Sequence, residues 1–170
     1  MRTGADEAAS PKYAHVERER RWLVDRLTRP PVRDESVLIE DCYIVGTRLR
    51  LRRMSDGGGM ALKLTKKYDA ADPTARAIVT AYLSDAEHAL LAGLPAHPIT
   101  KRRHAVPRDG REWSLDVFEG ALAGLELLEI EAPDAATLAA LAPPAWVVRE
   151  VSHDPRYQGG SLAVHGIPET

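Results

Sequence analysis

Residues of like charge recur at every second position in several short segments of this 170-residue chain. They are Glu17, Glu19, Glu129 and Glu131 among the acids, and Arg48, Arg50, Lys101 and Arg103 among the bases. Side chains two apart on a β-strand project from the same face, with Cβ atoms about 7 Å apart. Each set would therefore form a compact patch of one charge.

These patches have a specific chemical use if they meet. Two carboxylate pairs brought together can hold a hard divalent cation through oxygen. Guanidinium forks match phosphate oxygens in pairs, and crowded arginines repel one another unless an anion lies between them. A barrel whose inner face carried both sets would bind a metal ion and a polyphosphate, which is the equipment of phosphoryl transfer.

Strands must position these residues, and alternation of apolar and polar residues predicts them. Glu129 and Glu131 lie opposite Leu128 and Ile130, for example. About eight strands are expected, over residues 16–24, 37–44, 47–53, 61–67, 76–83, 98–106, 112–118 and 125–131. Short helices are expected over 84–93, over 134–141 and from residue 154. The fold class is therefore α+β, a closed eight-stranded antiparallel β-barrel with a few short flanking helices.

Composition limits the class of protein. The length favours one domain over 15–168, with residues 1–14 as a mobile leader. Net charge is −2 and only one phenylalanine is present, so neither a nucleic acid nor a membrane is expected as a partner. The single cysteine, Cys42, excludes a disulfide within the chain. With no long apolar run, a cytoplasmic location is the default expectation.

Six segments, in order, resemble the motifs of the CYTH domains, also called triphosphate tunnel metalloenzymes. The opening Glu-x-Glu-x-Lys motif has its counterpart in Glu17–Val24, with Arg21 in place of the lysine. The others are Arg48–Arg52 for Arg-x-Arg-x-Arg, Ile99–Arg103 for Ile-x-Lys-x-Arg, Trp113–Gly120 for Trp-x-x-Asp-x-Phe-x-Gly, Gly124–Glu131 for the Glu-x-Glu strand, and Trp146–Tyr157 for the closing segment. The resemblance runs from about residue 15 to 168.

The resemblance implies roles for individual residues. The implied ligands of Mg²⁺ or Mn²⁺ are Glu17, Glu19, Asp116, Glu129 and Glu131. The implied triphosphate-binding residues are Arg21, Arg48, Arg50, Lys63, Lys101 and Arg103. Tyr43 and Lys101 are implied catalytic residues, and Asp116 could instead orient a basic side chain. A homodimer is also compatible with the resemblance.

Two positions leave alternatives open. The phosphate-binding lysine of strand 61–67 could be Lys63, Lys66 or Lys67. Alternation along the strand, its parity, favours Lys63, because Lys66 lies on the same face as the apolar residues. Arg52, at the end of the arginine run, could face the interior or the solvent.

We expect metal-dependent hydrolysis of inorganic triphosphate, ATP, thiamine triphosphate or a similar small molecule. One alternative is an adenylate cyclase that makes cyclic AMP from ATP. Another is a polyphosphate-binding module with little turnover. The last is motivated by segment 76–82, where many members of the family carry Arg-x-Glu-x-Glu and this chain has no carboxylate.

Overall fold

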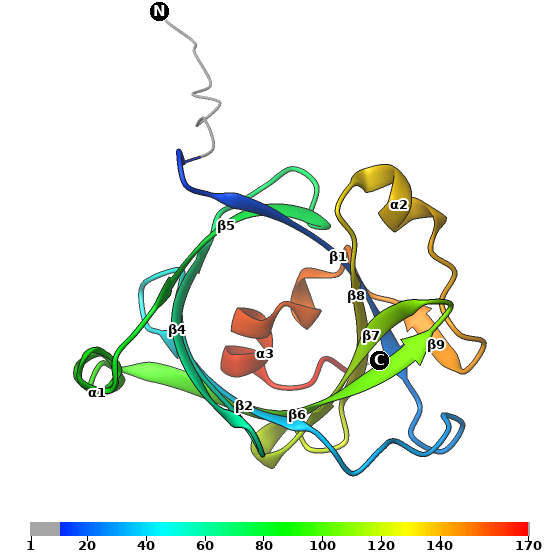
Figure 1. Cartoon of the computed structure of the whole chain (residues 1–170), viewed down its shortest axis with the longest axis horizontal. Coiled ribbons are helices and arrows are strands. Elements are labelled where there is room, and N and C mark those ends of the chain that lie inside the picture. Colours follow the sequence, from blue (N-terminus) through cyan, green and yellow to red (C-terminus); the bar gives the residue numbers. More distant parts are fainter. Residues whose placement is uncertain (1–10, 170) are drawn as a thin grey trace, which may run out of the picture.

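The computed structural model describes residues 11–169 and forms a closed barrel of eight antiparallel strands (Figure 1). The strands are β1 (His15–Val24), β2 (Val37–Ile44), β3 (Leu49–Asp56), β4 (Gly59–Lys67), β5 (Ala75–Tyr82), β6 (Ala96–Arg108), β7 (Arg111–Phe118) and β8 (Glu126–Glu131). Their order around the barrel is β5-β4-β3-β2-β6-β7-β8-β1, and pairing of β1 with β5 closes it. The expected fold class is confirmed. The expected leader, residues 1–14, lies outside the described residues over its first ten positions.

A ninth strand, β9 (Val147–Glu150), was not expected from the sequence. On one edge of β1, residues 15–18 pair with β5, and residues 22–24 pair with β9. The other edge of β1 pairs with β8. The short strand β9 therefore satisfies backbone groups of β1 that β5 does not reach.

The outer face of the barrel is apolar where it is covered. Trp22 of β1 and Trp113 of β7 lie with ring centroids 5.5 Å apart and are each 2% exposed. Leu138 of α2 (Ala135–Ala140) packs on the same cluster. Asp134 caps this helix by accepting a hydrogen bond from the amide of Thr137. The helix therefore covers the outward-facing apolar residues of β1, β7 and β8. The charged residues that alternate with them along each strand face the interior.

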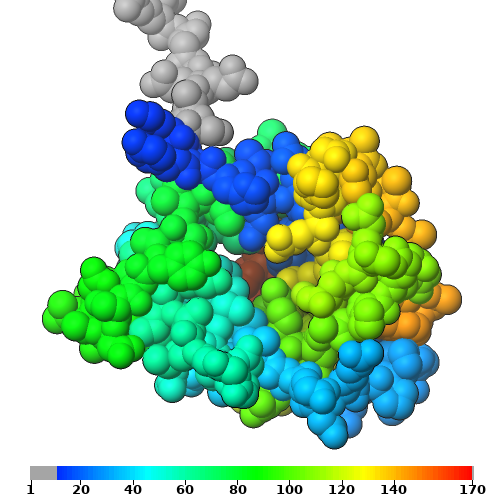
Figure 2. Space-filling view, viewed as in Figure 1, coloured from blue at the N-terminus to red at the C-terminus, as the bar shows by residue number. Residues whose placement is uncertain are grey.

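A second apolar cluster closes one end of the barrel. It joins Phe118 and Leu127 from the strands to Tyr157 of η2 (Pro155–Tyr157) and Leu162 of α3 (Gly159–His165). In Figure 1 the α3 helix lies inside the ring of strands. In Figure 2 a hollow opens between the strands, with the C-terminal segment deep inside it. The sequence predicted a helix from residue 154, and the structure has a short 3₁₀ turn there, followed by α3.

The remaining helices are short. The helix α1 (Asp85–Ala92) begins at the capping box of Ser84 and Glu87 that its sequence predicted, and none of its residues is buried. A 3₁₀ turn, η1 (Gly120–Leu122), connects β7 to β8. No helix in the described part of the chain has the length and hydropathy needed to cross a bilayer.

Candidate active site

A cavity of about 320 Å³ lies inside the barrel. Its charged lining residues come from seven of the eight strands, from the turn before β3 and from the loop after β4, and they are Glu17, Glu19, Arg21, Asp41, Arg48, Arg50, Arg52, Lys67, Asp69, Arg76, Lys101, Arg103, Glu129 and Glu131. Tyr43, Gln158 and the two glycines that begin α3 also line the cavity, at the end near α3. The alternating charges read from the sequence therefore lie on the inner face and surround one space.

Asp116 holds the two basic residues of β6. Its carboxylate is fully buried, and it contacts the Nζ of Lys101. Arg103 donates from Nε to Oδ1 at 2.7 Å and from Nη2 to Oδ2 at 2.8 Å. The register of β6 against β7 places Arg103 directly opposite Asp116. Asp116 therefore orients these basic side chains, which was one of the two roles expected for it.

Glu129 is also held by basic residues. It accepts a hydrogen bond from Arg103 Nη2 at 2.6 Å and lies 3.4 Å from Arg21 Nη2. Burial by itself would raise the pKa of Glu129, but the charges of Arg21, Lys101 and Arg103 hold the pKa well below its ordinary value. Burial lowers the pKa of the Lys101 ammonium, against the opposing effect of Asp116. In this arrangement Glu129 is an ionised partner of the basic groups.

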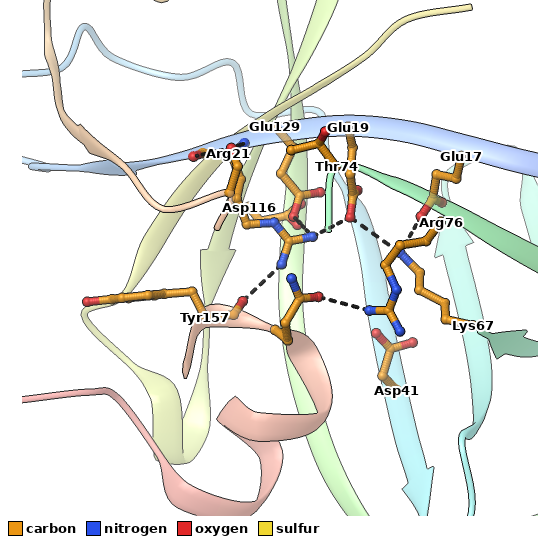
Figure 3. Close-up of polar contacts among 12 residues, drawn as sticks. Glu17, Glu19, Arg21, Asp41, Lys67, Thr74, Arg76, Asp116, Glu129 and Tyr157 are labelled. Atoms are coloured by element: carbon orange, nitrogen blue, oxygen red, sulfur yellow. Dashed lines mark hydrogen bonds and ion pairs between the residues drawn. The ribbon is translucent and has the colours of Figure 1, made fainter. Parts of the chain in front are cut away.

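Arg21 connects the two ends of the site (Figure 3). Its Nη2 donates to Glu19 Oε1 at 2.5 Å, and its Nη1 donates to the carbonyl of Tyr157 at 2.9 Å. The resemblance placed this arginine where the family has a lysine. A planar guanidinium can reach both groups at once, whereas a lysine presents a single charged nitrogen.

Asp41 was missed as a site residue, and Arg52, whose orientation the sequence left open, faces the interior with it. Asp41 accepts two hydrogen bonds from Arg52, at 2.6 and 2.7 Å, and both residues are buried. Arg50 Nε lies 3.8 Å from Asp41 and is buried without a hydrogen-bond partner among the described residues. Parity was the available signal, because Arg52 shares a strand face with Arg50, and Asp41 shares one with Tyr43.

A carboxylate cluster lies on the inner face of β1 and β8. Oxygens of Glu17, Glu19 and Glu131 lie within 4.8 Å of one another. Burial raises the pKa of Glu131, and the charges of Glu17 and Glu19 raise it further. Three crowded carboxylates are a donor set that suits a hard divalent cation. Glu129 and Asp116, which were also expected to be metal ligands, lie outside this cluster.

The lysine that reaches the carboxylate cluster is Lys67. Its Nζ contacts Glu17 and lies 3.3 Å from Glu19 Oε1. Lys63, which parity favoured, is not part of the cavity lining, and its Nζ lies over the ring of Tyr82 at 5.1 Å from the centroid. Both lysines have the same parity, so the difference between them is depth along the barrel. Arg48 lines the cavity and contacts Asp69, and both side chains are more than half exposed.

Tyr43 packs against the beginning of α3. A Cβ atom added at Gly159 would lie 1.9 Å from the Tyr43 hydroxyl, so the ring fits there only because residue 159 is a glycine. Burial raises the pKa of Tyr43, and the charge of Asp41 raises it further. The phenol therefore keeps its proton at neutral pH and can donate a hydrogen bond.

Two proteins named inorganic triphosphatase match part of the chain. One, from Acetivibrio thermocellus, is 41% identical over 64 residues, which are 38% of this chain and 40% of that protein. The other, from Nitrosomonas europaea, is 41% identical over 56 residues, 33% of this chain and 37% of that protein. The chain thus matches about two fifths of the length of these relatives. No family model matches the chain.

The fold matches solved structures over most of its length. The crystal structure of an inorganic triphosphatase, NE1496, has a TM-score of 0.58 at 24% identity and covers 90% of this chain and 97% of that one. The protein PH1819 from Pyrococcus horikoshii OT3 has a TM-score of 0.54 at 20% identity, with 72% and 82% covered. At these identities the likeness establishes the barrel fold.

Proposed function

This chain belongs to the CYTH, or triphosphate tunnel metalloenzyme, family, and from that premise we propose that it hydrolyses inorganic triphosphate or a triphosphorylated small molecule. One observation carries the proposal: basic side chains from five strands converge on one cavity. Arg50 Nε, buried without a hydrogen-bond partner among the described residues, points to an anion missing from this arrangement. Phosphate oxygens are the acceptors that such guanidinium groups bind best.

The carboxylate cluster is the proposed metal site. Glu17, Glu19 and Glu131 would hold Mg²⁺ or Mn²⁺ beside the bound phosphates. When bound, such an ion polarises a phosphoryl oxygen and offsets its charge. The metal-ligand roles expected for Asp116 and Glu129 are better described as positioning roles, because both hold basic side chains.

Lys101 and Arg103 are the proposed cationic groups at the transferring phosphoryl. Asp116 and Glu129 hold Arg103 from two sides, so it needs little rearrangement as charge develops. Tyr43 would donate a hydrogen bond to a phosphate oxygen at the end of the cavity near α3. Arg21, Arg48 and Arg50 would complete the binding of the phosphate chain, and Lys63 has no place in this arrangement.

The two alternative functions fit less well. Cyclisation of ATP needs a site for the base, whereas charged side chains make up most of the cavity lining, and its apolar residues Phe118, Leu127 and Leu162 are packed against one another. A module that only binds polyphosphate would not need positioned cations on both sides of the phosphates. The names of the partial relatives also favour hydrolysis. A cytoplasmic location, which was the default expectation, and a homodimer, which is compatible with the family resemblance, stay predictions.

A substrate screen tests the proposal. The purified chain is incubated with inorganic triphosphate, ATP or thiamine triphosphate and with Mg²⁺ or Mn²⁺, and phosphate and cyclic AMP are measured. We expect phosphate release that requires the cation, no cyclic AMP, and a loss of about 100-fold in turnover in Glu129→Gln, because Arg103 loses its second anchor. Glu112→Gln, on an exposed position of β7, is the matched control. Cyclic AMP, or tight triphosphate binding without any product, would select one of the alternatives.

A further inference from the structure

Lys67 occupies the carboxylate cluster in which the cation is proposed to bind. Its ammonium contacts Glu17 and lies 3.3 Å from Glu19 Oε1, so one positive charge lies between two of the three acids, and Glu19 also pairs with Arg21 (Figure 3). All three side chains are largely buried, at 22% exposure for Lys67, 15% for Glu17 and 13% for Glu19. Charges at this depth are weakly screened by solvent. A positive charge is therefore already built into the site.

The identity of the residues on β5 explains why Lys67 reaches so far. The strand β5 lies between β4 and β1, and Lys67 is paired directly with Ile78. Ile78 offers no anion, and of its neighbours on the same face of β5, Thr80 is neutral and Arg76 is basic. The ammonium must therefore extend past β5 to Glu17 on β1. An acidic residue at position 78 would have held Lys67 on its own side of the barrel.

We propose that Lys67 is a placeholder cation, which stabilises Glu17 and Glu19 while no metal ion is bound and must leave when one arrives. A divalent ion and an ammonium cannot share these carboxylates, because they would repel one another at close range in a poorly screened site. The cavity supplies the other position for Lys67, since a bound triphosphate offers it new anionic partners. This inference rests on the proposed function and adds to it that Lys67 must leave the carboxylates for the metal ion to bind.

The consequence is coupling between the two ligands. The metal ion by itself has to displace Lys67 into a cavity already rich in positive charge, so it binds weakly. With triphosphate present, the displaced ammonium gains a partner and the metal ion binds more tightly. By linkage, the metal ion strengthens triphosphate binding to the same extent. The enzyme would thus avoid holding a metal ion without its substrate.

Binding of Mn²⁺ alone, in the absence of any phosphate, tests this inference. Free Mn²⁺ is measured by its paramagnetic resonance signal during titration of the wild type and of Lys67→Met, which keeps the aliphatic stem and removes the charge. We expect the variant to bind Mn²⁺ about 10-fold more tightly, because the competing charge is gone. Lys67→Arg, which keeps the charge, should bind Mn²⁺ as the wild type does. If Lys67→Met is poorly folded by circular dichroism, Lys67→Gln replaces it.

The neighbouring lysine provides the matched control. Lys66 is exposed, points away from the cavity and lies over the ring of Tyr68. Lys66→Met should leave Mn²⁺ affinity unchanged. Equal or weaker Mn²⁺ binding in folded Lys67→Met would overturn the inference, even where metal-dependent hydrolysis by the wild type still supports the proposed function. Absence of that hydrolysis in the substrate screen would overturn the proposed function independently.

Discussion

Two walls of the barrel differ in how their inward side chains are balanced. On the paired wall, made by β6, β7 and β8, the inward residues Lys101, Arg103, Asp116 and Glu129 form one network of buried ion pairs. On the neutral wall, made by residues 78–80 of β5 and the adjoining part of β4, the inward residues are Ile78, Thr80 and Thr65, and the two threonine hydroxyls hydrogen-bond at 3.0 Å. The inner face therefore has one wall of fixed ion pairs and one wall that is neutral over these three residues, bordered by the basic Arg76 of β5 and Lys67 of β4.

The contrast indicates which inward charges are held in place and which one can move. A cation held by two carboxylates keeps its position whether or not a ligand is present, which favours catalysis by a pre-organised site. Lys67, at the border of the neutral wall, has partners that a metal ion would take from it. The paired wall thus positions charge, and the neutral wall leaves one charge free to move. The predictions below test this division.

Loss of Asp116 should have the largest effect. Asp116→Asn keeps the shape of the side chain but leaves Lys101 and Arg103 buried beside a neutral group. Breaking a buried ion pair from one side costs about 3–5 kcal/mol. We therefore expect a loss of that size in the free energy of unfolding, measured by urea denaturation at pH 7, together with loss of triphosphate hydrolysis. The exposed Glu112, on the same strand, should tolerate Glu112→Gln without a measurable change; equal shifts in the two variants would mean that the paired wall is not a stabilising network.

Loss of Asp41 should have a smaller and pH-dependent effect. Burial by itself would raise the pKa of Asp41, but the hydrogen bonds and charge of Arg52 hold the pKa below its ordinary value of 3.8. A carboxyl whose pKa is lower in the folded state stabilises the protein above the ordinary value and loses this contribution as the pH falls below it.

Wild type and Asp41→Asn should thus differ by about 2 kcal/mol in free energy of unfolding at pH 7. The difference should shrink as the pH falls below about 4. Urea denaturation of both proteins across this pH range measures it. A difference that stays constant down to pH 3 would show that Asp41 contributes through packing rather than through its charge.

The contrast between the walls also shows what a sequence can and cannot reveal here. Parity alone identified most inward charges, because a strand has only two faces. Parity could not separate Lys63 from Lys67, since depth along the barrel depends on how neighbouring strands are staggered. Asp41 was missed because it is the single inward carboxylate of its strand.

Elements placed by tertiary contacts were harder still to predict. The strand β9 is four residues long and forms because β5 leaves part of the edge of β1 unpaired. The position of α3 inside the barrel depends on Gly159 fitting against Tyr43, two residues more than a hundred positions apart. No local pattern in either segment records such a contact.

The smallest effect is expected on the neutral wall. Thr80→Val removes the hydrogen-bond partner of the buried Thr65 hydroxyl and should cost about 1 kcal/mol in the free energy of unfolding. The double variant Thr65→Val, Thr80→Val should cost no more than the single one, because neither hydroxyl is then left without a partner. Urea denaturation measures both effects. Thr80 is not part of the cavity lining, so triphosphate turnover of Thr80→Val should stay within about twofold of the wild type. A tenfold loss of turnover would mean that the neutral wall contributes to catalysis, which would contradict the distinction between the two walls.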